Sequence, residues 1–371
     1  MNRATIAFTG GGTGGHVFPG LAVAEALRAG GFAGRLAWIG SKKDSDRKVV
    51  EAAGLEFFAI PSGKLRRRPS LENAVDAFRV LAGYSSARRL LKELRPALLF
   101  SKGGYVSVPP CWAAASLGIP YITHESDLSP GLATRINSRR ADMVVISYEA
   151  TRARLPSAAR GKTIVAGNPV RAAIRRGDAA RGRALLGVRD AVPVIFFLGG
   201  SQGARQINEL AVAALPRLSK AAFVLHQRGE FAPDDDTGAF PPDGPRYKSY
   251  TFIREEMPDL LAAADLVVGR AGAGTLWECA ALEKAMLLVP LCGSGTRGDQ
   301  VDNADFFERA GAALSLVGSD ATADRLAEEA LGLLGDGPRR AAMGRSAKSV
   351  AGRDAASEIS VLILDRIREG L

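Results

Sequence analysis

Short apolar runs alternate with helix-length amphipathic segments along the whole chain. After the run at residues 5–9, for example, Val23, Ala26 and Leu27 fall on one side of a predicted helix and Glu25 on the other. This alternation is typical of βαβ units, so it predicts parallel sheets covered by helices. Strands are expected at residues 5–9, 35–39, 57–60, 97–101, 121–124 and 143–147, and again at 192–198, 222–226, 266–269 and 287–291.

The strand, glycine loop and helix that open the chain are repeated near its middle. Residues 192–198 form a second strand-like run, and Gly199 begins a second glycine-rich loop. The two copies predict an α/β protein with two Rossmann-like, doubly wound parallel-sheet domains, which a length of 371 residues accommodates. We expect domains at residues 1–168 and 169–345, with a C-terminal helix within 346–371 that packs back toward the first domain.

The net charge of +10 is carried by the first half of the chain. Residues 1–170 hold 24 Lys and Arg against 12 Asp and Glu, whereas residues 171–371 hold 25 against 27. A basic half indicates either an anionic partner, such as a bilayer or a substrate, or a solvated arginine-rich face. Nucleic acid is not expected as a partner, because aromatic residues, on which bases stack, make up only 6% of the chain.

Cysteine usage and hydropathy predict a location. Cys111, Cys279 and Cys292 are far apart in the sequence, so we interpret them as buried residues in a reducing compartment. The longest uncharged stretch, residues 103–123, is broken by Pro and Gly and is unlike a spanning helix, and no secretory signal precedes the first strand. We therefore expect a cytoplasmic protein without a transmembrane segment or signal peptide.

The first glycine loop satisfies the dinucleotide fingerprint G-x-G-x-x-G. A nicotinamide enzyme also needs an acidic residue at the tip of its second strand, to hold the ribose. Here that strand leads into Ser41 and Lys42, and Asp44 comes late, so a nicotinamide site is disfavoured. Glycines at a helix N-terminus still let a phosphate or sugar approach the backbone. His16 then lies at the mouth of the site, as either a functional or a structural imidazole.

Two further loops, in the second half, carry candidate ligand-binding groups. Ser201 and its neighbouring N–H groups suit a diphosphate, or form only a tight turn. Thr275 and Glu278 fit a capping box, and Glu278 alternatively suits two ribose hydroxyls. Asp299 and Gln300 follow in a polar loop suited to sugar hydroxyls. The three histidines show no metal-ligand spacing, so no metal site is expected.

Six segments, in this order along the chain, together resemble the MurG family: GGGTGGHVFPGLAVAEAL, KGGYVSVP, GIPYITHESDLSPGLA, GNPVR, LGGSQGARQIN and TRGDQVDNA. The resemblance implies a GT-B fold, whose two domains face each other across a cleft, the first for acceptor and membrane and the second for the UDP-sugar. It implies inverting transfer of N-acetylglucosamine from UDP-N-acetylglucosamine to undecaprenyl-diphosphate N-acetylmuramyl pentapeptide (lipid I), which gives lipid II for peptidoglycan synthesis. The implied location is peripheral, at the cytoplasmic face of the cell membrane, with cell-wall and division proteins as further partners.

The resemblance also assigns site residues. Thr13, Gly14 and Gly15 match the first glycine loop, at the sugar end of the donor. The donor-site matches later in the chain are Arg171, Ser201, Ile253, Ala273, Gly274, Thr275, Glu278 and Gln300. Within this set the implied roles are positive charge from Arg171, ribose binding by Glu278 and sugar-hydroxyl recognition by Gln300. The resemblance implies no cofactor or metal besides the donor substrate.

Two positions depart from the family pattern. Many members have Asn where this chain has Asp127, and the familiar serine of the third loop is Ala271 here. The role of Asp127, in catalysis or in substrate binding, is therefore open. Inversion requires a base that takes the proton of the acceptor hydroxyl. His16 is the first candidate, because a neutral imidazole is available in the cytoplasm, and Glu125 and Asp127 are the alternatives. His124 is either a further functional group or an orienting one.

A basic first half fits a lipid acceptor held in a bilayer. Candidate contacts with an anionic surface are the arginine clusters at residues 66–68, 88–89 and 139–140. Between the first two clusters an apolar stripe recurs at helical spacing, formed by Leu71, Val75, Phe78 and Leu81. This stripe either enters the membrane interface or faces the protein core.

Three other functions stay open at this point. Another UDP-sugar transferase of the same fold would act on a different lipid or small acceptor. A sugar-nucleotide epimerase would share the architecture without needing a basic half. A non-catalytic scaffold would bind UDP-sugar and organise wall enzymes without turnover. Acceptor-dependent release of UDP distinguishes the transferase from the scaffold, and binding of NAD or UDP tests the nicotinamide interpretation.

Overall fold

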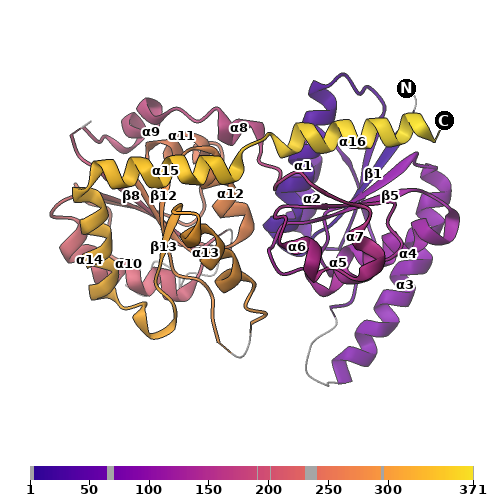
Figure 1. The fold of residues 1–371 in the computed structure, drawn as a ribbon, viewed down its shortest axis with the longest axis horizontal. Coiled ribbons are helices and arrows are strands. Elements are labelled where there is room, and N and C mark those ends of the chain that lie inside the picture. The colour runs from indigo at the N-terminus through magenta and orange to yellow at the C-terminus, as the bar shows by residue number, and fades with distance from the viewer. Residues whose placement is uncertain are drawn as a thin grey trace. The chain divides into compact units, whose positions relative to one another are not determined.

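The computed structural model describes residues 4–64, 71–189, 191–200, 202–229, 240–293 and 296–370. The chain divides into two compact units, drawn in Figure 1. Unit 1 is Met1–Arg171 together with Arg353–Leu371, and unit 2 is Ala172–Gly352. The boundaries therefore lie after residues 171 and 352, where the sequence placed them after 168 and 345.

Unit 1 is built on a seven-stranded parallel sheet with the order β3-β2-β1-β4-β5-β6-β7. The order reverses between β1 and β4, so the loops that follow these two strands meet at one edge of the sheet. The strands are β1 (Thr5–Thr9), β2 (Arg35–Gly40), β3 (Glu56–Ala59), β4 (Leu98–Ser101), β5 (Tyr121–Glu125), β6 (Met143–Ile146) and β7 (Thr163–Val165).

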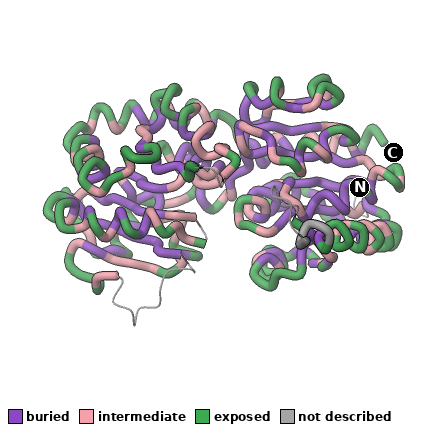
Figure 2. The backbone as a smooth tube through the Cα atoms, turned by 90° about the horizontal axis from the view of Figure 1, so that it is seen from below, coloured by how far each residue is buried: buried purple, intermediate pink, exposed green. Residues whose placement is uncertain are grey.

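Both faces of this sheet are covered. Ile6 and Phe8 of β1 pack in one apolar cluster, whereas Ala7 between them packs in another, as the alternation of a strand requires. Figure 2 shows the resulting buried interior of each unit and its exposed outer helices. The helices of unit 1 are α1 (Gly14–Ala29), α2 (Asp44–Ala52), α3 (Leu71–Leu94), α4 (Val108–Leu117), α5 (Leu132–Asn137), α6 (Thr151–Arg154), α7 (Ser157–Arg160) and α16 (Ala355–Glu369), with a 3₁₀ turn at Tyr105–Ser107.

The last helix, α16, belongs to unit 1 although unit 2 precedes it in the sequence. Ile359, Ile363 and Ile367 recur at helical spacing and are buried in the same cluster as Ile6 and Phe8. Each buried isoleucine stabilises this contact by about 1.5–3 kcal/mol. The apolar stripe therefore holds the end of the chain on unit 1.

Unit 2 repeats the architecture with a six-stranded parallel sheet in the order β10-β9-β8-β11-β12-β13. Here the order reverses between β8 and β11. The strands are β8 (Val194–Leu198), β9 (Phe223–Gln227), β10 (Tyr247–Tyr250), β11 (Leu266–Gly269), β12 (Ala285–Leu288) and β13 (Ala313–Ser315). The helices are α8 (Ala172–Arg175), α9 (Ala179–Leu186), α10 (Arg205–Leu218), α11 (Met257–Ala263), α12 (Ala273–Ala281), α13 (Asp299–Arg309), α14 (Ala323–Gly335) and α15 (Gly337–Ala351), with a 3₁₀ turn at Gly318–Asp320.

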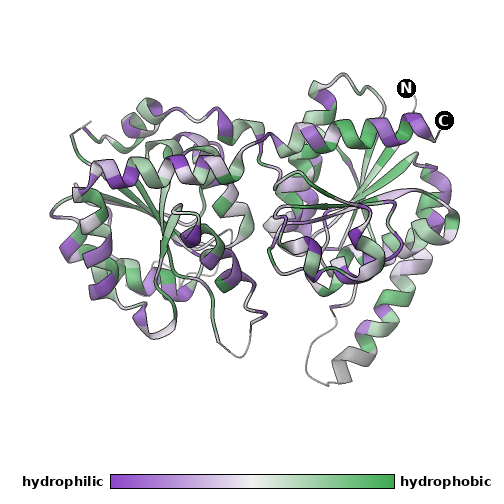
Figure 3. Cartoon of the chain, in the orientation of Figure 1, coloured by the Kyte–Doolittle hydropathy of each residue, from purple (hydrophilic) through white to green (hydrophobic). Residues whose placement is uncertain are grey.

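The structure confirms the predicted parallel α/β architecture and differs from it at the sheet edges. Figure 3 shows that the inner strands of both units are hydrophobic, which is why the sequence located them. The edge strands β7, β10 and β13 are short, and β10 reads Tyr-Lys-Ser-Tyr, so their apolar signal is weak. The strand expected at residues 287–291 is β12, which ends at Leu288; Pro290 has no N–H with which to extend the ladder.

Candidate functional site

The first candidate site lies where the strand order of the unit 1 sheet reverses. β1 leads into residues 10–13 and then α1, and β4 leads into residues 102–104. The Lys102 N–H donates to the Thr9 carbonyl oxygen at 2.8 Å, which keeps the two loops side by side. Ligands of doubly wound sheets bind at this kind of edge, outside the carboxyl ends of the strands.

His16 lies in the first turn of α1 and is half-buried. Its ring packs against the second loop, because a Cβ added to Gly104 would lie 2.9 Å from Cδ2 of His16. Gly104 also has a φ of +76°, which favours glycine. Thr13 and Gly15 are exposed and Gly14 is half-buried, so the backbone of this loop is open to a ligand. The fold thus brings together all four site residues that the sequence predicted here.

The first glycine loop is held by two residues that sequence reasoning missed. The Gly12 N–H donates to Oδ2 of Asp46 at 2.9 Å, and Asp46 is buried in the first turn of α2. A Cβ on Gly12, whose φ is +89°, would lie 2.8 Å from the Tyr105 ring. Burial, followed by the charge of Asp46, raises the pKa of Tyr105. An acidic residue that follows the second strand therefore binds the backbone of the first glycine loop. This residue is Asp46, whereas the sequence analysis considered only Asp44.

His124 is a structural residue at the end of β5. Its side chain is fully buried, and Nε2 donates to the Gly167 carbonyl oxygen at 2.9 Å. Burial, and then the charge of Lys102, lower the pKa of His124 well below its ordinary value, so the imidazole is neutral. Of the two roles that the sequence left open, the geometry supports the orienting one.

Glu125 holds a loop in place. Its Oε1 accepts from the Asp127 N–H at 3.0 Å and its Oε2 accepts from the Gly131 N–H at 2.9 Å. Both carboxylate oxygens are therefore occupied by the backbone of the loop that follows, and the residue is buried. Asp127 is half-buried at the start of the same loop. The geometry leaves His16 and Asp127 as the better placed candidates for a base.

Arg171 ends the first segment of unit 1, whereas the donor-site matches that follow it in the chain lie in unit 2. The guanidinium carbon of Arg171 lies 4.7 Å from the centroid of the Phe18 ring, which belongs to the first turns of α1. This distance is typical of a cation–π contact. Arg171 therefore brings its positive charge to the α1 end of unit 1.

The second candidate site follows the strands at which the unit 2 order reverses. Ser201 lies outside the described residues, so its predicted contact with a diphosphate is not placed. Ile253 follows β10 and is buried, and its N–H donates to Oε1 of Gln227 at 3.1 Å, which fixes this loop against the end of β9. The predicted backbone contact with uracil would therefore use the Ile253 carbonyl oxygen.

The capping-box interpretation of Thr275 is wrong. Helix α12 begins at Ala273, and Gly272 is its N-cap without a side-chain hydrogen bond. Thr275 is thus the third helical residue, and the free N–H groups of the first turn are available to an anion. Glu278 lies one turn further, half-buried, where the ribose-binding alternative remains a prediction. Ala271, at the position of the family's serine, is fully buried.

Gln300 lies in the first turn of α13 and is oriented by the backbone. Its Oε1 accepts from the Leu291 N–H at 2.9 Å, so the carboxamide presents its NH₂ group as the remaining donor. The expectation of three buried cysteines is wrong for Cys292, which is exposed in the loop beside Leu291, whereas Cys111 and Cys279 are buried. Within the described part of the chain, no group of His, Cys, Asp or Glu is arranged to hold a metal ion.

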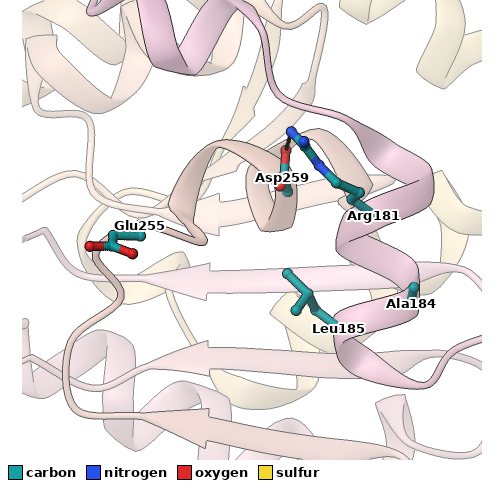
Figure 4. Close-up of a pocket in the computed structure, with 5 residues that line it drawn as sticks. All are labelled: Arg181, Ala184, Leu185, Glu255 and Asp259. Carbon is teal, nitrogen blue, oxygen red and sulfur yellow. Dashed lines mark hydrogen bonds and ion pairs between the residues drawn. The ribbon is translucent and has the colours of Figure 1, made fainter.

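A surface depression of unit 2 contains none of the predicted site residues. Figure 4 shows it between α9 and α11, with the ion pair of Arg181 and Asp259 (2.9 Å) on one wall and Glu255 at the other side. Leu185 and Ala184 supply its apolar lining. We assign no ligand to it.

Comparison with known proteins decides the family. Residues 6–146 match the glycosyltransferase family 28 N-terminal domain, and residues 194–359 match the C-terminal domain of that family. The UDP-N-acetylglucosamine–N-acetylmuramyl-(pentapeptide) pyrophosphoryl-undecaprenol N-acetylglucosamine transferase of Treponema denticola is 48% identical over 334 residues, which cover 86% of this chain and 85% of that protein. The crystal structure of Acinetobacter baumannii MurG has a TM-score of 0.72 at 25% identity and covers 98% of this chain and 99% of its own. The chain belongs to the MurG family.

Membership of the MurG family rests on the sequence match, because the fold alone does not decide it. The UDP-GlcNAc 2-epimerase from Neisseria meningitidis has a TM-score of 0.69 at 13% identity and covers 98% of this chain and 99% of its own. A MurG-family transferase and this epimerase therefore share the GT-B fold. For a MurG-family chain, the two glycine-loop edges are the expected places for the two substrates.

Proposed function

We propose that the protein transfers N-acetylglucosamine from UDP-N-acetylglucosamine to lipid I, giving lipid II in peptidoglycan synthesis. The observation that carries this proposal is the 48% identity to the Treponema denticola transferase across most of both chains. Glycine loops at the strand-order reversal of each sheet support it, since these are ligand-binding edges. A different lipid or small acceptor is the alternative, because the acceptor is named only through relatives.

The proposed chemistry divides between the two units. Unit 1 supplies the base for the acceptor hydroxyl, with His16 as first candidate and Asp127 as second. In unit 2, the free N–H groups at the start of α12 meet the negative charge of the leaving diphosphate, and Glu278 binds the ribose. The NH₂ group of Gln300 donates to a hydroxyl of the transferred sugar. We propose that no metal or other cofactor is needed for this step.

The test of the function is release of UDP from UDP-N-acetylglucosamine in the presence and absence of a lipid I analogue. The expected result is release that depends on the acceptor, together with a glycosylated product. Tight UDP binding without release would indicate the scaffold, and release with a diacylglycerol acceptor alone would indicate another transferase. Conversion of UDP-N-acetylglucosamine to its epimer would contradict the transferase directly.

A lipid acceptor requires a membrane-facing surface, and helix α3 supplies the candidate. Val75, Phe78 and Leu81 are 50%, 74% and 58% exposed, so the stripe that the sequence predicted does not face the core. The start of α3 also projects beyond the other helices of unit 1 (Figure 1). The side chain of Leu71 and the arginines at 66–68 lie outside the described residues. Exposed apolar side chains of this kind enter a bilayer interface.

Positive charge accompanies the exposed stripe in the proposed membrane contact. Arg89 on α3 is exposed and Arg88 is half-buried, while Arg139 and Arg140 are exposed after α5. Attraction of such residues to an anionic leaflet is worth about 1 kcal/mol each. No helix in the described parts of the chain is long and apolar enough to cross a bilayer. We therefore propose peripheral binding at the cytoplasmic membrane face, where wall-synthesis and division proteins are the expected neighbours.

Phe78→Ser combined with Leu81→Ser is expected to weaken binding to anionic phospholipid vesicles by about tenfold or more, because each side chain contributes about 1.5–3 kcal/mol when buried. Co-sedimentation with vesicles measures the loss. The matched control is Val361→Ser, which removes an apolar residue that is 54% exposed on α16. Turnover of a water-soluble acceptor analogue should be unchanged in both variants. Equal loss of vesicle binding in the control would contradict the assignment to α3.

A further inference from the structure

Lys102 is a fully buried lysine at the edge of unit 1 that carries the first candidate site. It directly follows β4, and its side chain is 1% exposed. Gly10 makes room for its stem, because an added Cβ would lie 3.2 Å from Cβ of Lys102, and α1 packs beside it, where a Cβ on Gly20 would be in ordinary contact at 3.9 Å. The glycine loop and α1 therefore enclose this cation.

The ammonium group is linked to the end of unit 1 by a short chain of hydrogen bonds. Nζ of Lys102 donates to Oγ of Ser126, and Ser126 in turn donates to Oδ1 of Asn168 at 2.7 Å. Ser126 and Asn168 are both buried. Asn168 lies three residues before Arg171, the last residue of the first segment of unit 1. The Lys102 side chain thus links the end of β4 to the loop after β5 and, through Ser126, to the segment around Asn168.

Two carboxylates balance the buried charge. Burial lowers the pKa of Lys102 to about 8, and attraction to Glu125 and then Asp127 offsets part of this effect. The other titratable neighbour is His124, whose imidazole is neutral. A buried ammonium group without nearby anions would be strongly destabilising, so Lys102 and these carboxylates depend on each other.

We propose that Lys102 is a positioning residue for the transfer reaction: through Ser126 and Asn168 it fixes the loop that follows β5, and with this loop Asp127, at the acceptor edge. This inference rests on the proposed function. Lys102 does not touch a substrate, because its side chain is enclosed. Its effect on the reaction is exerted through the position and charge of Asp127, one of the two candidate bases.

A double-mutant cycle tests the proposal, with Lys102→Met, which has similar length and no charge, and Asp127→Asn. We expect Lys102→Met to lower kcat by about tenfold or more while the KM for UDP-N-acetylglucosamine stays within about twofold, since the residues predicted to bind uracil and ribose, Ile253 and Glu278, lie in unit 2. The double variant should be as active as the less active of the two single variants, because the two residues act as one unit. Ser126→Ala, which keeps the buried charge, should give a smaller loss of kcat with the same unchanged donor KM.

Lys162→Met is the matched control. Lys162 is also in unit 1, but its Nζ donates to the carbonyl oxygens of Arg139 and Ala141, before the start of β7. Thermal unfolding of every variant separates instability from loss of turnover, and Lys162→Met should change only the former. Two results would overturn the positioning role. One is a double variant whose loss of kcat equals the product of the losses in Lys102→Met and Asp127→Asn. The other is a wild-type kcat in both Lys102→Met and Ser126→Ala. Absence of acceptor-dependent release in the wild type would instead contradict the proposed function.

Discussion

His16→Ala is expected to lower acceptor-dependent release of UDP by about two to four orders of magnitude, the usual contribution of a positioned general base. The imidazole lies in the first turn of α1, at the edge where β1 and β4 end, and packs against Gly104. Alanine suits a helix, and the His16 ring is only half-buried, so unit 1 should fold normally. The residues predicted to bind uracil and ribose, Ile253 and Glu278, lie in unit 2, so the affinity for UDP should stay within about twofold of the wild-type value.

Steady-state release of UDP with a lipid I analogue measures this effect, and calorimetric titration with UDP supplies the control for donor binding. Asp127→Asn is the companion variant, because Asp127 is the other candidate base that the geometry leaves open. A His16→Ala enzyme with nearly wild-type kcat, beside an inactive Asp127→Asn enzyme, would assign the base to Asp127. Loss of UDP affinity in His16→Ala would show that the residue belongs to the donor site instead.

Gly104→Ala is expected to lower kcat by about 100-fold, because an added methyl group displaces the His16 ring from its position against residue 104. The new Cβ would lie 2.9 Å from Cδ2 and 3.2 Å from Cγ of His16. The φ of +76° together with a ψ of 160° lies in a region that is essentially restricted to glycine, so the added strain costs about 1–3 kcal/mol of unfolding free energy. Kinetics with the lipid I analogue and chemical denaturation measure the two effects separately.

Gly118→Ala separates strain from displacement. Gly118 caps the end of α4 with a φ of +69°, and nothing lies within 4 Å of an added Cβ. Its ψ of 18° is that of the left-handed helical conformation, so the variant should show a smaller loss of stability, about 1–2 kcal/mol, with wild-type kcat. If Gly104→Ala and Gly118→Ala retained the same activity per folded molecule, the contact between Gly104 and His16 would have no catalytic importance.

Much of the fold follows from local sequence. The strand expected at residues 266–269 is β11 at those same residues, and the first strand is also placed correctly. β1 is a mostly apolar run followed by Gly10 and β11 is an apolar run that ends at Gly269, so their burial and their ends are encoded within a few residues. The edge strands β7, β10 and β13 were not predicted, because a strand with one neighbour needs less apolar surface.

Local patterns left two alternatives open where two structures share one signature. Thr275 followed by Glu278 fits a capping box, yet α12 begins two residues earlier at Ala273. The stripe of Val75, Phe78 and Leu81 has the spacing of a core-facing helix, yet all three side chains are exposed. In both cases the spacing is correct, and what the segment packs against decides its meaning.

The sequence by itself determined the two α/β repeats, the glycine loops and the family, because strand burial and helix starts depend on neighbouring residues. The tertiary structure alone showed that Asp46 binds the Gly12 N–H, 34 positions away, and that Lys102 binds Ser126, 24 positions away. Such contacts exist only because the strand order places β2 beside β1 and β5 beside β4. Strand order is set by long-range packing of whole βαβ units, and periodicity within a segment carries no record of it.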